Sequence, residues 1–262
     1  MIRMHRCTAL GASARCGRVV GITMRVVVLL WLHVTALFGQ QPNVHYLHQG
    51  MMPPGAIGSR QLQRGGPLPG YFQPVEIKAP SGALVSLAVE DTFEPAAPTP
   101  RVAGMLIGSV YRVKVTNIAG ADGMEVFPTI EIIDRTYPPR GQELRFPIPV
   151  ELTMDDLRIA LAGKFVTRVV YLENPRSALP VPEDPAAHNW FEAAPGRDPL
   201  AVADALGRPV AILRMGGRLP KGPAEIDGQF LFGCPPLLQF SSELRALHPV
   251  MDDSPLPGEE LD

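Results

Sequence analysis

Residues 111–135, YRVKVTNIAGADGMEVFPTIEIIDR, decide the fold class, because apolar and polar side chains alternate in both halves of this stretch. Tyr111, Val113 and Val115 fall on one face of the first half, and the polar side chains between them fall on the other. A second apolar run occupies 126–132, and the glycine-containing stretch between the two runs is typical of a hairpin connection. The pattern therefore predicts two half-buried antiparallel strands.

Further runs with a strand-like pattern are centred on 75–77, 85–89, 144–152, 165–172 and 210–215. The run at 165–172 is apolar on both faces, so we expect a central strand there. In the run at 126–132, Pro128 favours an edge position or a bulge.

Two short helices are expected between these strands. Thr153 is a good N-cap for a helix that ends at Gly163, with Asp155 and Asp156 in its first turn. A second helix is expected over 199–206. Seven strands and two small helices predict an all-β, mainly antiparallel fold, namely an immunoglobulin-like β-sandwich, with a partly open β-barrel as the alternative.

The N-terminal region has the features of a secretory signal peptide. Five arginines precede the apolar run 26–39, which has about 14 residues, whereas a membrane-spanning helix needs roughly 20. We expect cleavage before Gln40; the alternative is a retained anchor over 19–39. Both place the following residues outside the cytosol.

The composition changes after this leader. The chain has 24 Lys and Arg against 26 Asp and Glu, and five of the arginines but none of the acidic residues lie in 1–39, so cleavage changes the formal net charge from -2 to -7. Clustered positive charge is what a nucleic-acid-binding protein needs, so that class is not expected. Of the three cysteines only Cys234 follows the leader, so the exported chain has no internal disulfide, and we expect a structural thiol.

The domain organisation follows from these patterns. We expect a leader at 1–39, a flexible Pro/Gly-rich spacer at 40–70, a β-sandwich domain at 71–220, and a C-terminal extension with an acidic disordered tail at 221–262. At 111–135 and at RFPIPVELTMDDLRIALAGKFVTRVVYLENP (145–175) the chain resembles a family of predicted secreted proteins from planctomycete-like bacteria. The resemblance covers about 66–220 and implies an exported protein without a known activity or catalytic residues.

The spacer contains a candidate metal site. His45, His48, Met51 and Met52 lie within eight residues and are side chains that can bind copper. Because a spacer gives little fixed geometry, ordinary linker composition is the favoured reading, and no cofactor is expected.

The segment 174–199 is a candidate binding loop. It holds six prolines and carries His188, Trp190 and Phe191 near its middle. A long segment of this kind inside a compact domain is uncommon unless it is functional or disordered. The two aromatic side chains would either bind a partner or cover one end of the core.

Three common catalytic or nucleotide-binding motifs are absent from the sequence. There is no nucleophile elbow, no His-Glu-x-x-His and no phosphate-binding loop. Glu131, Asp134 and Glu151 could form a hydrolytic acid and base pair, but a solvated strand position explains Glu131 and a turn ion pair with Arg135 explains Asp134.

The sequence therefore predicts an exported, non-enzymatic structural or interaction module of the cell envelope, located in the periplasm, at the cell surface or outside the cell. Its partner would be an envelope protein or polymer, with membrane contact only if 19–39 is retained. The alternative is a secreted hydrolase that acts on polysaccharide or another envelope polymer.

Overall fold

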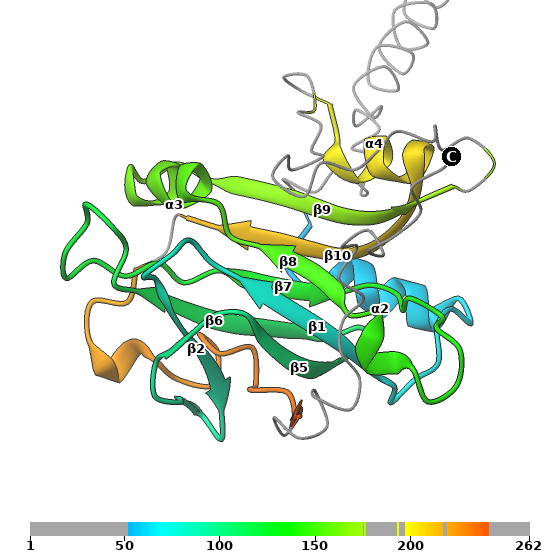
Figure 1. Ribbon diagram of the computed structural model, residues 1–262, viewed down its shortest axis with the longest axis horizontal. Helices are drawn as coiled ribbons and strands as arrows, with labels where there is room; N and C mark the ends of the chain where they lie inside the picture. Colours follow the sequence, from blue (N-terminus) through cyan, green and yellow to red (C-terminus); the bar gives the residue numbers. More distant parts are fainter. Residues whose placement is uncertain (1–51, 175, 177–192, 194–196, 217–218, 241–262) are drawn as a thin grey trace, which may run out of the picture. The chain divides into compact units, whose positions relative to one another are not determined.

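The computed structural model describes residues 52–174, 176, 193, 197–216 and 219–240 (Figure 1). Its helical elements are α2 (Ala56–Gln63), η1 (Glu143–Arg145), α3 (Met154–Leu161), α4 (Pro199–Leu206) and η2 (Pro223–Glu225). Its strands are β1 (Phe72–Lys78), β2 (Leu84–Val89), β3 (Thr92–Phe93), β4 (Ala97–Pro98), β5 (Arg101–Leu106), β6 (Val110–Thr116), β7 (Thr129–Ile132), β8 (Ile148–Glu151), β9 (Val166–Glu173), β10 (Gly207–Met215) and β11 (Leu237–Gln239).

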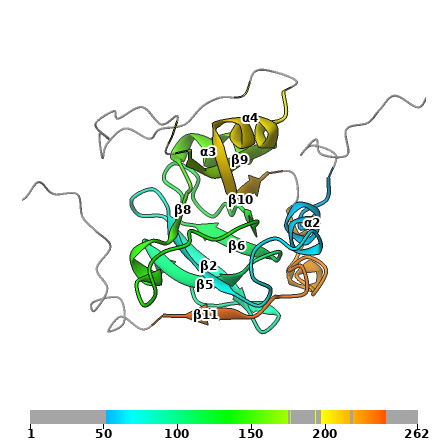
Figure 2. The same cartoon turned by 90° about the vertical axis from the view of Figure 1, so that its right-hand side faces the viewer.

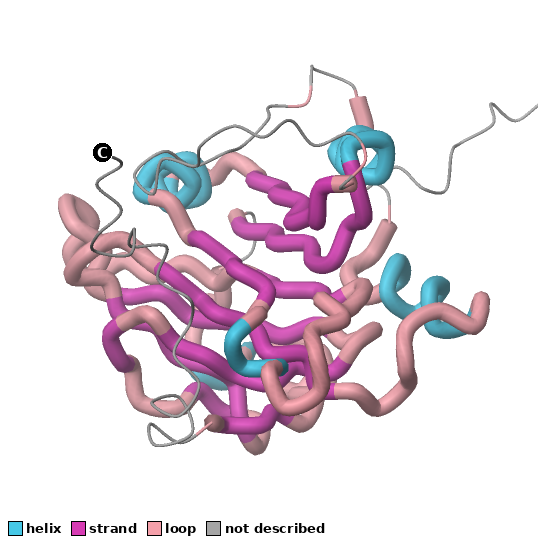
Figure 3. Tube along the Cα trace, turned by 45° about the vertical axis from the view of Figure 1, so that its right-hand side comes forward, coloured by secondary structure: helices cyan, strands magenta, loops and turns pink. Residues whose placement is uncertain are grey.

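The strands of this described part form two sheets. The smaller sheet has the order β11-β5-β1-β8, in which only the β1–β8 pair is parallel. The larger sheet is antiparallel with the order β3-β2-β6-β7-β10-β9, and β4 also pairs with β2. The helices lie around the two sheets and not between them (Figure 3). The predicted β-sandwich is confirmed, the strands do not close into one barrel, and this strand order does not show the immunoglobulin-like arrangement that we expected.

The main core lies between the two sheets. The alternating apolar residues that predicted the strands point into it, among them Val75, Ile77, Val113, Ile130 and Leu213, all of them 2 % exposed or less. Burial of each such side chain contributes about 1.5 to 3 kcal/mol to stability.

The outer face of the larger sheet is also covered. Ile57 of α2 packs there against Ile133 and Ile212. The segment that follows η2 packs Phe230 against Phe127, with the ring centroids 5.4 Å apart. Figure 2 shows α2 beside the strands and β11 at the edge far from α4. Several strand positions that look solvent-facing from the sequence are therefore buried.

The local predictions for the helices are confirmed. Thr153 caps α3, because its hydroxyl accepts a hydrogen bond from the Asp156 N–H at 3.2 Å. Gly163 follows with φ of +75°, a conformation that favours glycine. α4 occupies 199–206, as expected, and is capped by Asp198.

Two predicted strand positions are wrong. β7 lies between β6 and β10, so Pro128 does not mark an edge. The β6–β7 register is the same before and after Pro128, so there is no bulge either. β9 is the outermost strand of the larger sheet in the described part, and not a central strand. Its two faces are apolar because Val166, Val170 and Leu172 pack on the core and α4 packs on the strand as well.

The structure also differs from the expected domain limits. α2 lies within the stretch 40–70 that we expected to be a flexible spacer, and its Ile57 is buried. At the other end, β11 pairs with β5, and Phe230 and Leu231 are fully buried, so part of the expected C-terminal extension belongs to the fold. No helix in the described ranges has the length and apolar character needed to cross a membrane.

Candidate functional site

A buried ion pair links the two inner strands β7 and β10. Arg214 Nη1 donates to Glu131 Oε2 at 2.7 Å, and Glu131 Oε1 accepts from the Ile57 and Gly58 N–H groups at 3.1 and 2.9 Å. Glu131 is 0 % exposed and Arg214 is 4 % exposed. The two N–H groups belong to the first turn of α2, so the carboxylate caps this helix from a distant strand.

This arrangement corrects the sequence interpretation of Glu131 as a solvated strand residue. The strand alternation placed it on the outer face correctly, but α2 covers that face. A hydrolytic carboxyl group must reach the substrate or the attacking water. Glu131 reaches neither, and its two oxygens are used by α2 and Arg214.

The other carboxylates are also engaged structurally. Asp134 binds Arg208 of β10, and not the adjacent Arg135 side chain that we expected. Asp156 is buried and accepts two hydrogen bonds from Arg168 of β9, at 3.0 and 2.7 Å. Glu151 ends β8 in a half-buried position.

The loop 133–138 is fixed to the smaller sheet through one buried amide. Gln73 of β1 is 0 % exposed, and its Oε1 accepts from the Thr136 N–H at 3.0 Å, while its Nε2 donates to Thr136 Oγ1 at 3.2 Å. Thr136 Oγ1 also donates to the Phe146 carbonyl at 2.9 Å. These bonds fix Thr136 in place, and Arg135 and Tyr137 are its two neighbours in the chain.

Arg135 and Tyr137 form an arginine–tyrosine cluster with Tyr71 and Arg208. The Arg135 guanidinium lies 4.1 Å from the Tyr137 ring centroid and 5.4 Å from that of Tyr71, and Arg208 lies 4.7 Å from Tyr137. Arg208 is neutralised by Asp134 and donates to the Arg135 carbonyl at 2.9 Å. No carboxylate of the described residues lies within ion-pair distance of Arg135, and its buried Nε has no hydrogen-bond partner there.

The pKa of the Tyr71 hydroxyl reflects its position beside Arg135. Burial raises the pKa of its hydroxyl, the Glu143 carboxylate raises it further, and the Arg135 guanidinium opposes this by favouring the phenolate.

Tyr137 has a strained backbone and an exposed side chain. Its φ is +55°, it precedes Pro138, and it is 52 % exposed. Bulky residues rarely adopt positive φ, and a residue before proline is restricted further, which costs of the order of 1 to 3 kcal/mol. Strain of this kind is concentrated at functional sites, and here it presents an aromatic ring beside two guanidinium groups.

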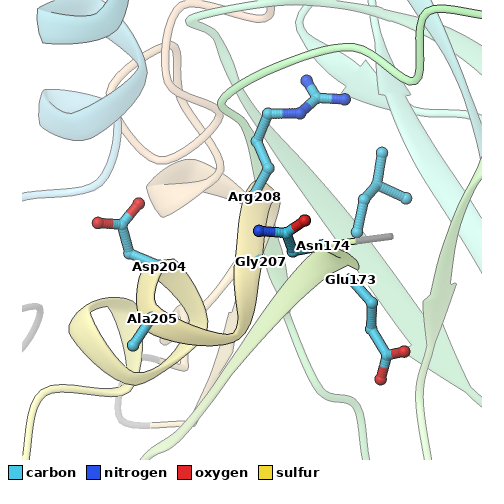
Figure 4. Close-up of a pocket in the computed structure, with 7 residues that line it drawn as sticks. Glu173, Asn174, Asp204, Ala205, Gly207 and Arg208 are labelled. Atoms are coloured by element: carbon cyan, nitrogen blue, oxygen red, sulfur yellow. The ribbon is translucent and has the colours of Figure 1, made fainter. Parts of the chain in front are cut away.

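A pocket of about 510 Å³ adjoins the cluster through Arg208. The end of β9, α4 and the start of β10 form its walls. The residues that line it are Leu172, Glu173, Asn174, Asp204, Ala205, Gly207 and Arg208. In Figure 4 the Asp204 and Glu173 carboxylates point away from each other. They therefore offer separate hydrogen-bond acceptors and do not form an acid and base pair.

Most of the site residues predicted from sequence lie outside the described residues, namely His188, Trp190, Phe191, His45, His48 and Met51. Met52 is described and packs against the apolar cluster of Ile57. No group of three or more potential metal-binding His, Cys, Asp or Glu side chains occurs in the part of the chain that the structure describes. Cys234 is a free thiol, half-buried against the cluster that contains Phe230.

Sequence reasoning missed the arginine–tyrosine cluster. The stretch DRTYPPR (134–140) carries a signal, because it places two arginines and a tyrosine around two prolines at the end of a strand. Tyr71 and Arg208 are far away in sequence, and no local pattern brings them to this loop.

Comparisons with known proteins give no further information: no family model, no curated protein and no solved structure matches this chain. The resemblance to secreted planctomycete-like proteins stays a prediction, and function must be inferred from the geometry of the site.

Proposed function

We propose that this protein is an exported, non-enzymatic interaction module of the cell envelope or exterior, and that it binds an envelope polymer or protein through the arginine–tyrosine cluster and the adjoining pocket. The leader composition supports export. The β-sandwich supplies a rigid support for the loop 133–138.

Arg135 is the observation that carries this proposal. A half-buried guanidinium normally has an acidic partner, because an unpaired charge loses hydration without compensation. Arg135 is held over two tyrosine rings with no such partner among the described residues. A ligand with a complementary group would supply it.

The roles of the carboxylates support a binding function over hydrolysis. Glu131 is buried beneath α2, and Asp134 and Asp156 are bonded to arginines.

The binding test mixes the purified full-length protein with each of a panel of isolated envelope polymers. Both the binding of the polymer and its hydrolysis are measured. We expect binding of at least one polymer without turnover, weakened by Arg135→Gln. Turnover by the wild-type protein would establish the hydrolase alternative, and binding that is indifferent to Arg135→Gln would place the ligand elsewhere.

The export test is fractionation of the native cells, with mass spectrometry of the protein's N-terminus. We expect a chain that begins near Gln40 in the exported or envelope fraction. Recovery in the cytosol with residues 1–39 intact would contradict export.

A further inference from the structure

The cluster and the pocket offer a ligand two different chemistries side by side. At one end Arg135 forms no ion pair with a described residue and its buried Nε has no hydrogen-bond partner there, and at the other end Glu173, Asp204 and Asn174 line the pocket. Arg208 belongs to both ends, since it lines the pocket and lies over Tyr137. One ligand that occupies both must carry an anionic group and, beside it, hydrogen-bond donors.

The cationic end suits a carboxylate. A guanidinium presents its N–H groups in a planar fork that matches two carboxylate oxygens, and such charge-assisted bonds are stronger than neutral ones. Stacking over Tyr137 and Tyr71 fixes the orientation of the Arg135 guanidinium before the ligand arrives, so little entropy is lost on binding.

The pocket end suits hydroxyl groups. Its two carboxylates accept hydrogen bonds, and Asn174 beside them holds the Arg176 N–H through its Oδ1 at 3.0 Å. A chain with negative charge at every position, such as an acidic peptide, would bring carboxylates against Glu173 and Asp204 and be repelled. A sugar brings several hydroxyl donors, and a pocket of about 510 Å³ is within the range of small-ligand sites.

We propose that the ligand is an acidic glycan built from uronic-acid units, with one carboxylate on Arg135 and the hydroxyls of the adjoining sugar in the pocket. This inference rests on the proposed function, since it names the ligand class of the same site.

The test is calorimetric titration of the full-length protein with four probes. They are an oligogalacturonate, its methyl-esterified counterpart with the same sugars and no charge, a neutral gluco-oligosaccharide and an oligoglutamate. We expect the oligogalacturonate to bind at least about tenfold more tightly than the other three, and added salt to weaken its binding.

Three variants locate the bound groups. Arg135→Gln should lower oligogalacturonate affinity about tenfold or more. Arg158→Gln is the matched control, because Arg158 is an exposed arginine on α3 that pairs only with the exposed Asp155 in the described structure, and it should bind as the wild type does. Asp204→Asn, at an exposed position that does not endanger folding, should lower affinity by a smaller factor and should not change the preference for the charged glycan.

Each alternative result overturns the inference in a distinguishable way. Equal binding of the esterified and free oligogalacturonates, or unchanged binding by a folded Arg135→Gln protein, would exclude carboxylate recognition. Equal binding of oligoglutamate would exclude the glycan. In these cases the proposed function stands if another envelope polymer or an envelope protein binds with dependence on Arg135, and it fails together with the inference if neither does.

Discussion

Glu131 and Arg214 form an ion pair of 2.7 Å between two inner strands, and the same carboxylate holds the first turn of α2. One side chain therefore couples the packing of a helix to the larger sheet. Buried ion pairs add little to stability against an apolar alternative, but breaking one leaves an uncompensated charge.

Glu131→Gln should therefore lower the free energy of unfolding by about 3 to 5 kcal/mol, because it leaves the Arg214 guanidinium buried without a counter-charge. Chemical denaturation monitored by circular dichroism measures the change. The control is the double variant Glu131→Met with Arg214→Met, which removes both charges and should lie within about 2 kcal/mol of the wild type, the remaining loss being the cap of α2. A double variant as unstable as the single one would show that the charge pair is not the cause.

Two adjacent aspartates in α3 provide a second comparison. Asp156 is 1 % exposed and is bonded twice to Arg168, whereas the Asp155 side chain is 82 % exposed. Asp156→Asn should cost about 1.5 to 3 kcal/mol, and Asp155→Asn less than about 1 kcal/mol. Thermal unfolding of both variants at neutral pH measures the difference. Equal effects would mean that both residues act only through the helix dipole.

The packing of α2 depends on the absence of a side chain at Gly58. An added Cβ would lie 2.8 Å from the Gly108 Cα and 3.0 Å from the Ile132 carbonyl oxygen, both of them backbone atoms. Gly58→Ala should therefore destabilise by about 1 to 3 kcal/mol, although alanine favours helices by about 1 kcal/mol. Ser59→Ala, at the next and exposed position, should be neutral or slightly stabilising. Denaturant midpoints of the two variants test this, and a stabilised Gly58→Ala protein would contradict the close approach.

The sequence predicted those parts of the fold that depend on neighbouring residues. Alternation identified β1, β2, β6 and β10, and capping residues identified α3 and α4. It did not predict α2, because this helix has no side-chain cap of its own and is capped by Glu131, which lies 73 residues away from Gly58. It also missed β5, in which Gly104 interrupts the apolar pattern and leaves space for Leu238 of β11.

The position of β9 shows a different limit. Its two apolar faces indicated that both would be covered, and one of them does pack on the core, but Phe165 at the start of the other is 61 % exposed. Whether a face is covered also does not determine whether the edge of the strand is paired. The same holds for the site, since Arg135 and Tyr137 are close in sequence, whereas Tyr71 and Arg208 are brought to them only by the arrangement of the sheets.

Tyr111 should make the fold sensitive to alkaline pH. Its hydroxyl donates to the Pro236 carbonyl and accepts from the Leu106 N–H, both at 2.8 Å, and burial raises its pKa from 10.0 to about 12, although the Leu106 hydrogen bond opposes the rise. The native state therefore keeps this proton while the unfolded chain loses it. The stabilisation is fully present below pH 10 and is lost as the pH rises from 10 to about 12, by roughly 2 to 3 kcal/mol.

Urea denaturation between pH 8 and pH 12 measures this loss, and Tyr111→Phe is the control. The variant should be less stable at neutral pH by about 1 to 3 kcal/mol, because the Leu106 N–H and the Pro236 carbonyl lose their partner. Its stability should fall less steeply above pH 10, and the remaining slope would come from groups such as Tyr71 and Tyr171, whose pKa values are also raised by burial. An unchanged alkaline slope in Tyr111→Phe would show that the proton on Tyr111 does not stabilise the link between β6 and the C-terminal segment.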